Sequence, residues 1–422
     1  MTARPAHPRA LAALALATLL SSLGTSIANV ALPTLEDAFG TSFSQVQWVV
    51  LAYLIAVTAL VVVAGRLGDL LGPRRLMVAG IGVFTVASAL CAAAPGLWTL
   101  VAARALQGLG AAAMVALALV LVTEAVPEHR RGRAMGLLGS MSAAGTALGP
   151  SVGGVVIAAA DWRAIFLVNV PLGVVAMVLA RRHLPADRPG GAAGAVGPLA
   201  GVGLLRDRAI AAGIVTSALV STVVMATLVV GPFHLSRALG LSPALVGLVM
   251  SAGPVVVALT GVPAGRIADR VGPRRTTLTG LAAMAAGTLL LAIAPRGAGV
   301  PGYLGPILVV TLGYALFQTA NTTGVMGAAP ADRRGVTSGL LNLSRNLGLI
   351  TGTALMGAVF AFAAGTGDTA SAPAADVATG TRATFALATV LIAAAWAVAL
   401  AGRPRRSQKL HGSPIGGGTP AG

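Results

Sequence analysis

The sequence predicts an all-α membrane protein in which twelve transmembrane helices form two six-helix bundles related by a pseudo-twofold axis. Three observations predict this fold. Of the 422 residues, 56% are hydrophobic and 10% are charged, whereas soluble domains carry about 25% charged residues. The chain divides into twelve apolar stretches, and a charged segment in its first half returns in its second half.

The apolar stretches are bounded by charged residues and by Gly and Pro turn signals. A helix needs about 20 residues to cross about 30 Å of hydrocarbon, and most of the stretches reach that length. Six spans therefore fall in each half. We expect them at 10–33, 46–66, 76–94, 97–122, 134–158, 164–180, 209–235, 244–265, 277–294, 302–328, 336–363 and 384–402.

The charged segment after the second span is the clearest internal repeat. GRLGDLLGPRR at 65–75 and GRIADRVGPRR at 265–275 agree at seven of eleven positions. A second pair, PEHRRG at 127–132 and PADRRG at 330–335, has nearly the same offset. Two halves with one architecture are therefore expected. They comprise a bundle over 1–180, a cytoplasmic loop over 181–208, a bundle over 209–402 and a disordered cytoplasmic tail over 403–422.

The net charge of +17 indicates membrane topology rather than a nucleic-acid partner. With the N-terminus inside, 23 of the 29 Lys and Arg residues fall in inner loops and tails. The positive-inside rule then places both termini in the cytoplasm and the protein in an inner or plasma membrane. No loop is long enough to fold into a nucleic-acid-binding module. No metal site or cofactor motif is found, and we expect a monomer.

Four motifs resemble those of the major facilitator superfamily, in the same order and at the same spans. The 65–75 segment resembles its signature loop, and RALQGLGAA from Arg104 resembles its span-four motif. GTALGPSVGG at 145–154 resembles the antiporter motif, and DWRAIFLVNVPLG at 161–173 resembles a motif of the multidrug branch. The resemblance covers nearly the whole chain. It implies a transporter of the drug:proton antiporter branch and not an enzyme.

The repeated charged loop has two interpretations. Gly72 and Pro73 permit a tight reversal, and the paired arginines can simply anchor a solvated turn at the membrane surface. The resemblance instead implies a latch that biases one conformation. Its residues would be Asp69, Arg74 and Arg75 in the first copy and Asp269, Arg274 and Arg275 in the second.

Span five carries a row of small residues. Gly145, Gly149 and Gly153 share one helical face, and Pro150 removes a backbone donor there. Packing of small residues between membrane helices is the simpler interpretation. The resemblance, which adds Gly154, implies proton-driven export and a leak-resistant seam against the other half. On that interpretation, leucine at Gly149 or Gly153 abolishes transport with little loss of expression.

Polar residues within the spans are candidates for substrate binding or coupling. Arg104 and Arg345 carry charge inside spans, where desolvation is costly, and the resemblance implies a role for Arg104 in proton coupling. The alternative is that these groups only tie helices together by bonding to backbone carbonyls. The other candidates are Asn29, Gln107, Gln318, Asn321, Asn342 and Asn346.

Acidic residues are absent from the spans as drawn. Gly24 stands where the multidrug branch usually has an Asp. A cation in a low-dielectric cavity needs a compensating negative group. The sequence therefore predicts a preference for neutral, zwitterionic or anionic substrates over permanent cations. It assigns proton coupling to Glu124 or Asp69, near a cavity mouth, or to a proton carried on the substrate.

The predicted function is that of a secondary transporter in the lipid bilayer. It exports a small organic compound, a drug or a metabolite, by alternating access in exchange for protons. One alternative is a proton symporter or facilitator that takes up a metabolite. Another, from a different class, is a membrane receptor or structural protein, which would not need two matching latch loops and an antiporter helix.

Overall fold

The computed structural model describes residues 8–187, 204, 206–330, 333–365 and 372–402. Within these ranges, twelve helical segments are long and apolar enough to cross a membrane. The predicted twelve-span α-helical fold is thereby confirmed. The expected tail over 403–422 and most of the expected loop lie outside the described residues.

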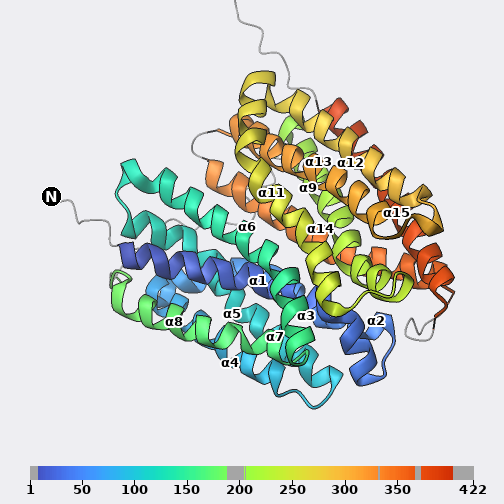
Figure 1. Cartoon of the computed structure of the whole chain (residues 1–422). Coiled ribbons are helices and arrows are strands. Elements are labelled where there is room, and N and C mark those ends of the chain that lie inside the picture. The colour runs from blue at the N-terminus through green and yellow to red at the C-terminus, as the bar shows by residue number, and fades with distance from the viewer. Residues whose placement is uncertain (1–7, 188–203, 205, 331–332, 366–371, 403–422) are drawn as a thin grey trace, which may run out of the picture.

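The first half runs from blue to green in Figure 1 and the second from green to red. The first half comprises α1 (Pro8–Phe39), α2 (Phe43–Val46), α3 (Trp48–Leu71), α4 (Pro73–Ala92), α5 (Leu97–Ala125), α6 (Glu128–Ala159), α7 (Ala164–Leu167) and α8 (Asn169–His183). The second half begins with a span built of α9 (Arg208–Met225), the π-helical turn η2 (Ala226–Val230), α10 (Gly231–Phe233) and the π-helical turn η3 (His234–Ala238). It continues with α11 (Pro243–Val271), α12 (Pro273–Ile293), the 3-10 turn η4 (Arg296–Ala298), α13 (Gly299–Ala328), α14 (Arg334–Ala363) and α15 (Ala374–Ala401).

The two halves repeat the same helix pairings. In the first half α1 packs on α6, α3 on α5, and α4 on α5 and α8; in the second half α9 packs on α14, α11 on α13, and α12 on α13 and α15. The halves meet where α6 packs against α11 and α3 packs against α14. Figure 1 shows α6 and α11 at this junction.

The repeated charged segments form two matching reversals. Gly72 ends α3 with a φ of 95°, and Gly272 ends α11 with a φ of 93°. This region of backbone space favours glycine. Pro73 and Pro273 then occupy the first turn of the next helix, where no backbone donor is needed. Both reversals lie at the end of the molecule where α1 begins and α15 ends, which we call the basic end. The other is the far end.

Candidate functional site

Arg104 lies fully buried in α5. Its Nε donates to the carbonyl of Val49 at 2.9 Å, and its Nη2 donates to the carbonyl of Gly24 at 2.9 Å. The guanidinium carbon lies 4.3 Å from the ring centroid of Tyr53, within the range of a cation–π contact. Arg104 therefore ties α5 to α1 and α3 inside the first half.

Gln107 extends the same network. It accepts a hydrogen bond from Arg104 and donates to the hydroxyl of Ser88 at 2.7 Å. At Gly24, an added Cβ would lie 3.1 Å from the hydroxyl of Tyr53, so a carboxylate side chain has little room there. The carbonyl of Gly24 binds the guanidinium instead. This geometry favours the helix-tying interpretation of Arg104 and Gln107, and contact with a substrate stays a prediction.

Arg104→Ala is expected to lower the free energy of unfolding by about 3 kcal/mol, because it leaves a cavity and several buried carbonyls without donors. The melting temperature of the purified protein measures this loss. Arg163→Ala is the matched control, since Arg163 is an exposed arginine at the far end of the same half. Equal melting temperatures for the two variants would contradict the assignment.

Two predicted polar residues also bond to backbone within their own half. Asn29 is fully buried and donates to the carbonyls of Thr25 and Ser26 on its own helix. Asn321 donates to the carbonyl of Gly213 at 3.0 Å, which joins α13 to α9. Asn321 is thus a tie between two helices, whereas the Asn29 bonds stay within α1. A role in binding stays a prediction for both.

The remaining predicted polar residues have fewer contacts within the protein. Asn342 is exposed, whereas Gln318, Arg345 and Asn346 are half-buried. In the part of the chain that the structure describes, no hydrogen bond or ion pair engages any of these four side chains. They come from α13 and α14. Their polar groups, and the Oδ1 atom of Asn29, remain available to a ligand in the described chain.

The glycine row of α6 packs within its own half, which corrects the predicted seam. An added Cβ would lie 2.5 Å from the carbonyl of Leu19 at Gly145, 2.0 Å from the hydroxyl of Ser26 at Gly149, and 2.6 Å from a methyl of Val30 at Gly153. Each of these neighbours belongs to α1. Leucine at Gly149 or Gly153 is therefore expected to disrupt the first half, and not to act selectively on transport.

A different face of α6 forms the seam with the second half. At Gly154, an added Cβ would lie 2.7 Å from the Cα of Gly247 on α11, and at Gly247 it would lie 2.5 Å from the carbonyl of Pro150. The hydroxyls of Ser151 and Ser251 lie 2.5 Å apart across the same contact. Pro150 and Gly154 thus contact the second half at the far end, and the leak-resistant role of this contact stays a prediction.

An ion pair that the sequence analysis missed also joins the halves at the far end. Helix α1 continues through Pro33 to Phe39 and carries Glu36 and Asp37. Arg237 of η3 donates to Asp37, and its Nη2 lies 4.0 Å from a carboxylate oxygen of Glu36. The Glu36 side chain is 0% exposed and that of Asp37 is 52% exposed. The predicted first span ends at residue 33, whereas α1 continues to Phe39, so this helix carries two acids that the predicted spans lack.

Aromatic rings also join the two halves at the far end. Phe43 of α2 lies with its ring centroid 4.6 Å from that of Phe233 in α10 and 5.0 Å from that of Phe360 in α14. All three side chains are fully buried. Because Phe43 belongs to the first half and the other two to the second, the cluster closes the far end with apolar contacts as well as charge.

The basic end differs along the same helices. Glycines lie near the basic ends of the four helices that meet between the halves. An added Cβ would find no atom within 4 Å at Gly65 of α3, Gly139 of α6, Gly261 of α11 or Gly339 of α14. These helices are in tight contact at the far end and have open space at the basic end. The difference indicates a conformation closed at the far end and open at the basic end.

The predicted latch residues contact their own halves in this conformation. The backbone amides of Arg74 and Arg75 donate to Asp187 at 2.7 and 3.2 Å, and the Arg74 guanidinium donates to the carbonyl of Arg181. Arg274 likewise donates to the carbonyl of Leu400 at 3.0 Å. Each arginine thus holds the end of its half's last helix, and Asp187 is a member that the sequence analysis missed.

Four other predicted residues show no such contact or cannot be assessed. Asp269 and Arg275 are exposed, and no ion pair of theirs is seen among the described residues. Asp69 and Glu124 lie in α3 and α5, but their side chains fall outside what the structure describes. The latch and the coupling role of Glu124 therefore stay predictions.

Comparison with known proteins identifies transporters as relatives of this chain. Residues 14–353 match the family described as the Major Facilitator Superfamily. The chain is 28% identical over 398 residues to "Riboflavin transporter RibZ" of Clostridioides difficile (strain 630), covering 82% of this chain and 87% of that protein. It is 30% identical over 405 residues to "Multidrug resistance protein Stp" of Mycobacterium tuberculosis (strain ATCC 25618 / H37Rv), covering 83% of this chain and 75% of that protein. The fold is similar to the crystal structure of a bacterial homolog of the human lysosomal transporter Spinster, with a TM-score of 0.79, 15% identity, and coverage of 95% of this chain and 98% of that one.

Proposed function

Because the chain belongs to the major facilitator superfamily, we propose that this transporter exports a small organic compound in exchange for protons. The likeness to a multidrug resistance protein supports a drug-like cargo. The likeness to a riboflavin transporter supports a metabolite as the alternative cargo. The main support for alternating access comes from α3, α6, α11 and α14. These helices are tightly packed at the far end and have open space at the basic end.

The basic end faces the cytoplasm in this proposal. Lys and Arg concentrate at the ends of helices that would then be inside, as the positive-inside rule requires. The far end, with its seam and ion pair, would then face outward. The described conformation would be open to the cytoplasm, ready to load a compound for export.

Opening the outer end requires the far-end contacts to separate. The Gly154–Gly247 seam, the ring cluster and the ion pair of Arg237 all bridge the halves there. As the halves rock about the centre, the helix ends at the basic end would approach each other. The paired arginines at 74–75 and 274–275 are placed at that end, where a latch would act.

The charges of the spans favour a substrate without a permanent positive charge. Arg104 is bonded inside the first half, and Glu36 faces Arg237 at the far end. Arg345 is the charged mid-span side chain that lacks a partner in the described part of the chain. A half-buried cation within a membrane span is stabilised by an anionic ligand, so we assign Arg345 to the recognition of substrate charge. Protons would couple through Glu124 or Asp69, or travel on the substrate.

Everted membrane vesicles provide the test. A panel of dyes, antibiotics and organic acids is expected to include neutral or anionic compounds that accumulate only while the pH gradient is maintained. Arg345→Ala should weaken recognition of an anionic compound about tenfold or more, as expected for a hydrogen bond to a charged group, and should affect a neutral compound less. Arg266→Ala, at an exposed arginine of α11, is the control. Robust efflux of ethidium by the reconstituted protein would contradict the proposed charge preference, and accumulation that survives collapse of the gradient would contradict proton exchange.

A further inference from the structure

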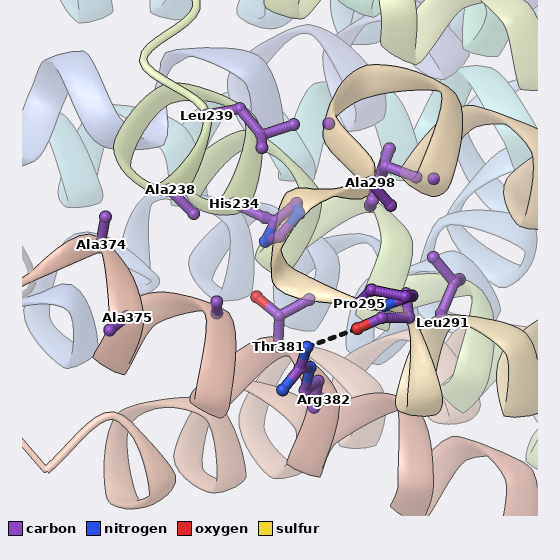
Figure 2. Close-up of a pocket in the computed structure, with 15 residues that line it drawn as sticks. His234, Ala238, Leu239, Leu291, Pro295, Ala298, Ala374, Ala375, Thr381 and Arg382 are labelled. Carbon is purple, nitrogen blue, oxygen red and sulfur yellow. Dashed lines mark hydrogen bonds between the residues drawn. The ribbon is translucent and has the colours of Figure 1, made fainter.

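A cavity of about 230 Å³ lies in the second half at the far end, away from the seam. It is lined by η3, the end of α12, the start of α13 and the first turns of α15. Figure 2 shows His234, Thr381 and Arg382 grouped at its centre, with the alanines of α15 on one side. Leu291, Pro295 and Ala298 lie on the other side, so an apolar wall surrounds a few polar groups.

Arg382 gives this cavity a positive charge. The half-buried guanidinium donates to the carbonyl of Ala294 (Figure 2). A guanidinium carries five N–H donors, and among the described residues no carboxylate lies within ion-pair distance of it. A partly desolvated cation with unused donors is stabilised by an anionic partner. The cavity therefore favours a ligand with a negative group.

Two further features bear on the ligand. The Nδ1 atom of His234 is buried without a hydrogen-bond partner in the described chain, so it offers a ligand a donor or an acceptor according to its tautomer, and its ring stacks on Tyr303 with centroids 5.3 Å apart. Helix α15 follows Pro373, whose carbonyl accepts from the amides of Asp376 and Val377, and among the described residues no side chain caps the amides before them. Ala374 and Ala375, in that first turn, line the cavity. The N-terminus of a helix favours negative charge through its unpaired N–H groups.

We propose that this cavity binds the anionic head of a small amphipathic molecule. A carboxylate or phosphate oxygen accepts hydrogen bonds from Arg382, and the apolar part packs against Ala378, Leu291 and Pro295. The volume equals the liquid volume of about eight water molecules, which suits a short-chain carboxylate or the head group of an anionic lipid. The seam residues do not line the cavity, so the site is separate from the proposed export route. It contacts η3, the same turn that carries Arg237.

Binding of octanoate to the full-length protein in phosphatidylcholine nanodiscs tests the site. Octanoate is expected to raise the melting temperature of the wild type. Arg382→Gln should weaken this binding about tenfold or more, because a hydrogen bond to a charged group contributes roughly that much. Arg163→Gln, which removes a far-end arginine from the other half, should bind like the wild type. No stabilisation of the wild type, or equal binding by wild type and Arg382→Gln, would overturn the proposal.

Arg382→Gln also removes the hydrogen bond to the carbonyl of Ala294, so a second variant tests the cavity without disturbing that bond. Ala378→Phe fills the cavity while leaving the guanidinium in place, and it too should lose octanoate binding. Unchanged binding in this variant would place the octanoate elsewhere and overturn the site. Nanodiscs that contain phosphatidylglycerol distinguish the source of the anion. If octanoate no longer stabilises the wild type there, the lipid head group occupies the cavity; if it still does, a free carboxylate does so.

Discussion

Gly247→Leu is expected to abolish transport while leaving the protein folded in the membrane. In the described conformation, a Cβ at this position would lie 2.5 Å from the carbonyl of Pro150 and 2.8 Å from the Cα of Gly154. Both contacts are with backbone, which cannot move aside as a flexible side chain would. The far end could not close, so the transporter could not return to the state open at the basic end. Transport assays in vesicles measure the loss of transport, and the melting temperature of the purified protein shows whether it remains folded.

Gly149→Leu is the informative comparison for this experiment. Its Cβ would lie 2.0 Å from the hydroxyl of Ser26 on α1, within the same half. This variant should lose expression and thermal stability together with transport, whereas Gly247→Leu should lose transport alone. If Gly247→Leu transports normally, the far-end seam does not close in the transport cycle. If it fails to fold, the contact is part of the structural core.

The fold could be predicted from the sequence because its main signals are long and repeated. Twelve apolar stretches and two copies of one charged loop define the spans and the two halves. The two tight turns between helices could also be predicted, because Gly72–Pro73 and Gly272–Pro273 provide the backbone freedom and the helix start that such a turn needs. The paired arginines then mark the end of the molecule that the structure shows as the basic end.

The partner of each helical face could not be predicted. Gly153 and Gly154 are adjacent, but neighbouring residues on a helix point about 100° apart, so one packs on α1 and the other on α11. Glu36 was missed for a related reason. Proline usually ends a helix, which places the end of the first span at Pro33, whereas α1 continues through it and buries the next acid. Arg237, which forms an ion pair with that acid, lies 201 residues further along the chain.

Reversing the charge of Arg237 is expected to open the far end. In Arg237→Asp the new carboxylate would face Glu36 and Asp37, so attraction between the halves becomes repulsion. Breaking a buried ion pair costs about 3 kcal/mol, and 1.4 kcal/mol corresponds to about tenfold in an equilibrium. Because Asp37 is half-exposed and screened, a shift of about tenfold or more is a reasonable scale. Transport should fall because the closed state becomes poorly populated.

Reactivity of a cysteine at Ser251 measures this shift directly. Ser251 is buried at the seam with 7% exposure, so in a background with Cys91→Ala an impermeant maleimide added outside should label Ser251→Cys slowly. Arg237→Asp should accelerate labelling about tenfold, and the swapped pair Asp37→Arg with Arg237→Asp should slow it again by restoring opposite charges across the seam. A cysteine at Asp161, exposed at the same end, should react in every background and so verifies that this end faces outward. If Arg237→Asp leaves the Ser251→Cys labelling rate unchanged while the Asp161→Cys control reacts, the ion pair does not hold the far end closed. If the swapped pair labels as fast as Arg237→Asp alone, the effect of Arg237→Asp does not arise from its pairing with Asp37.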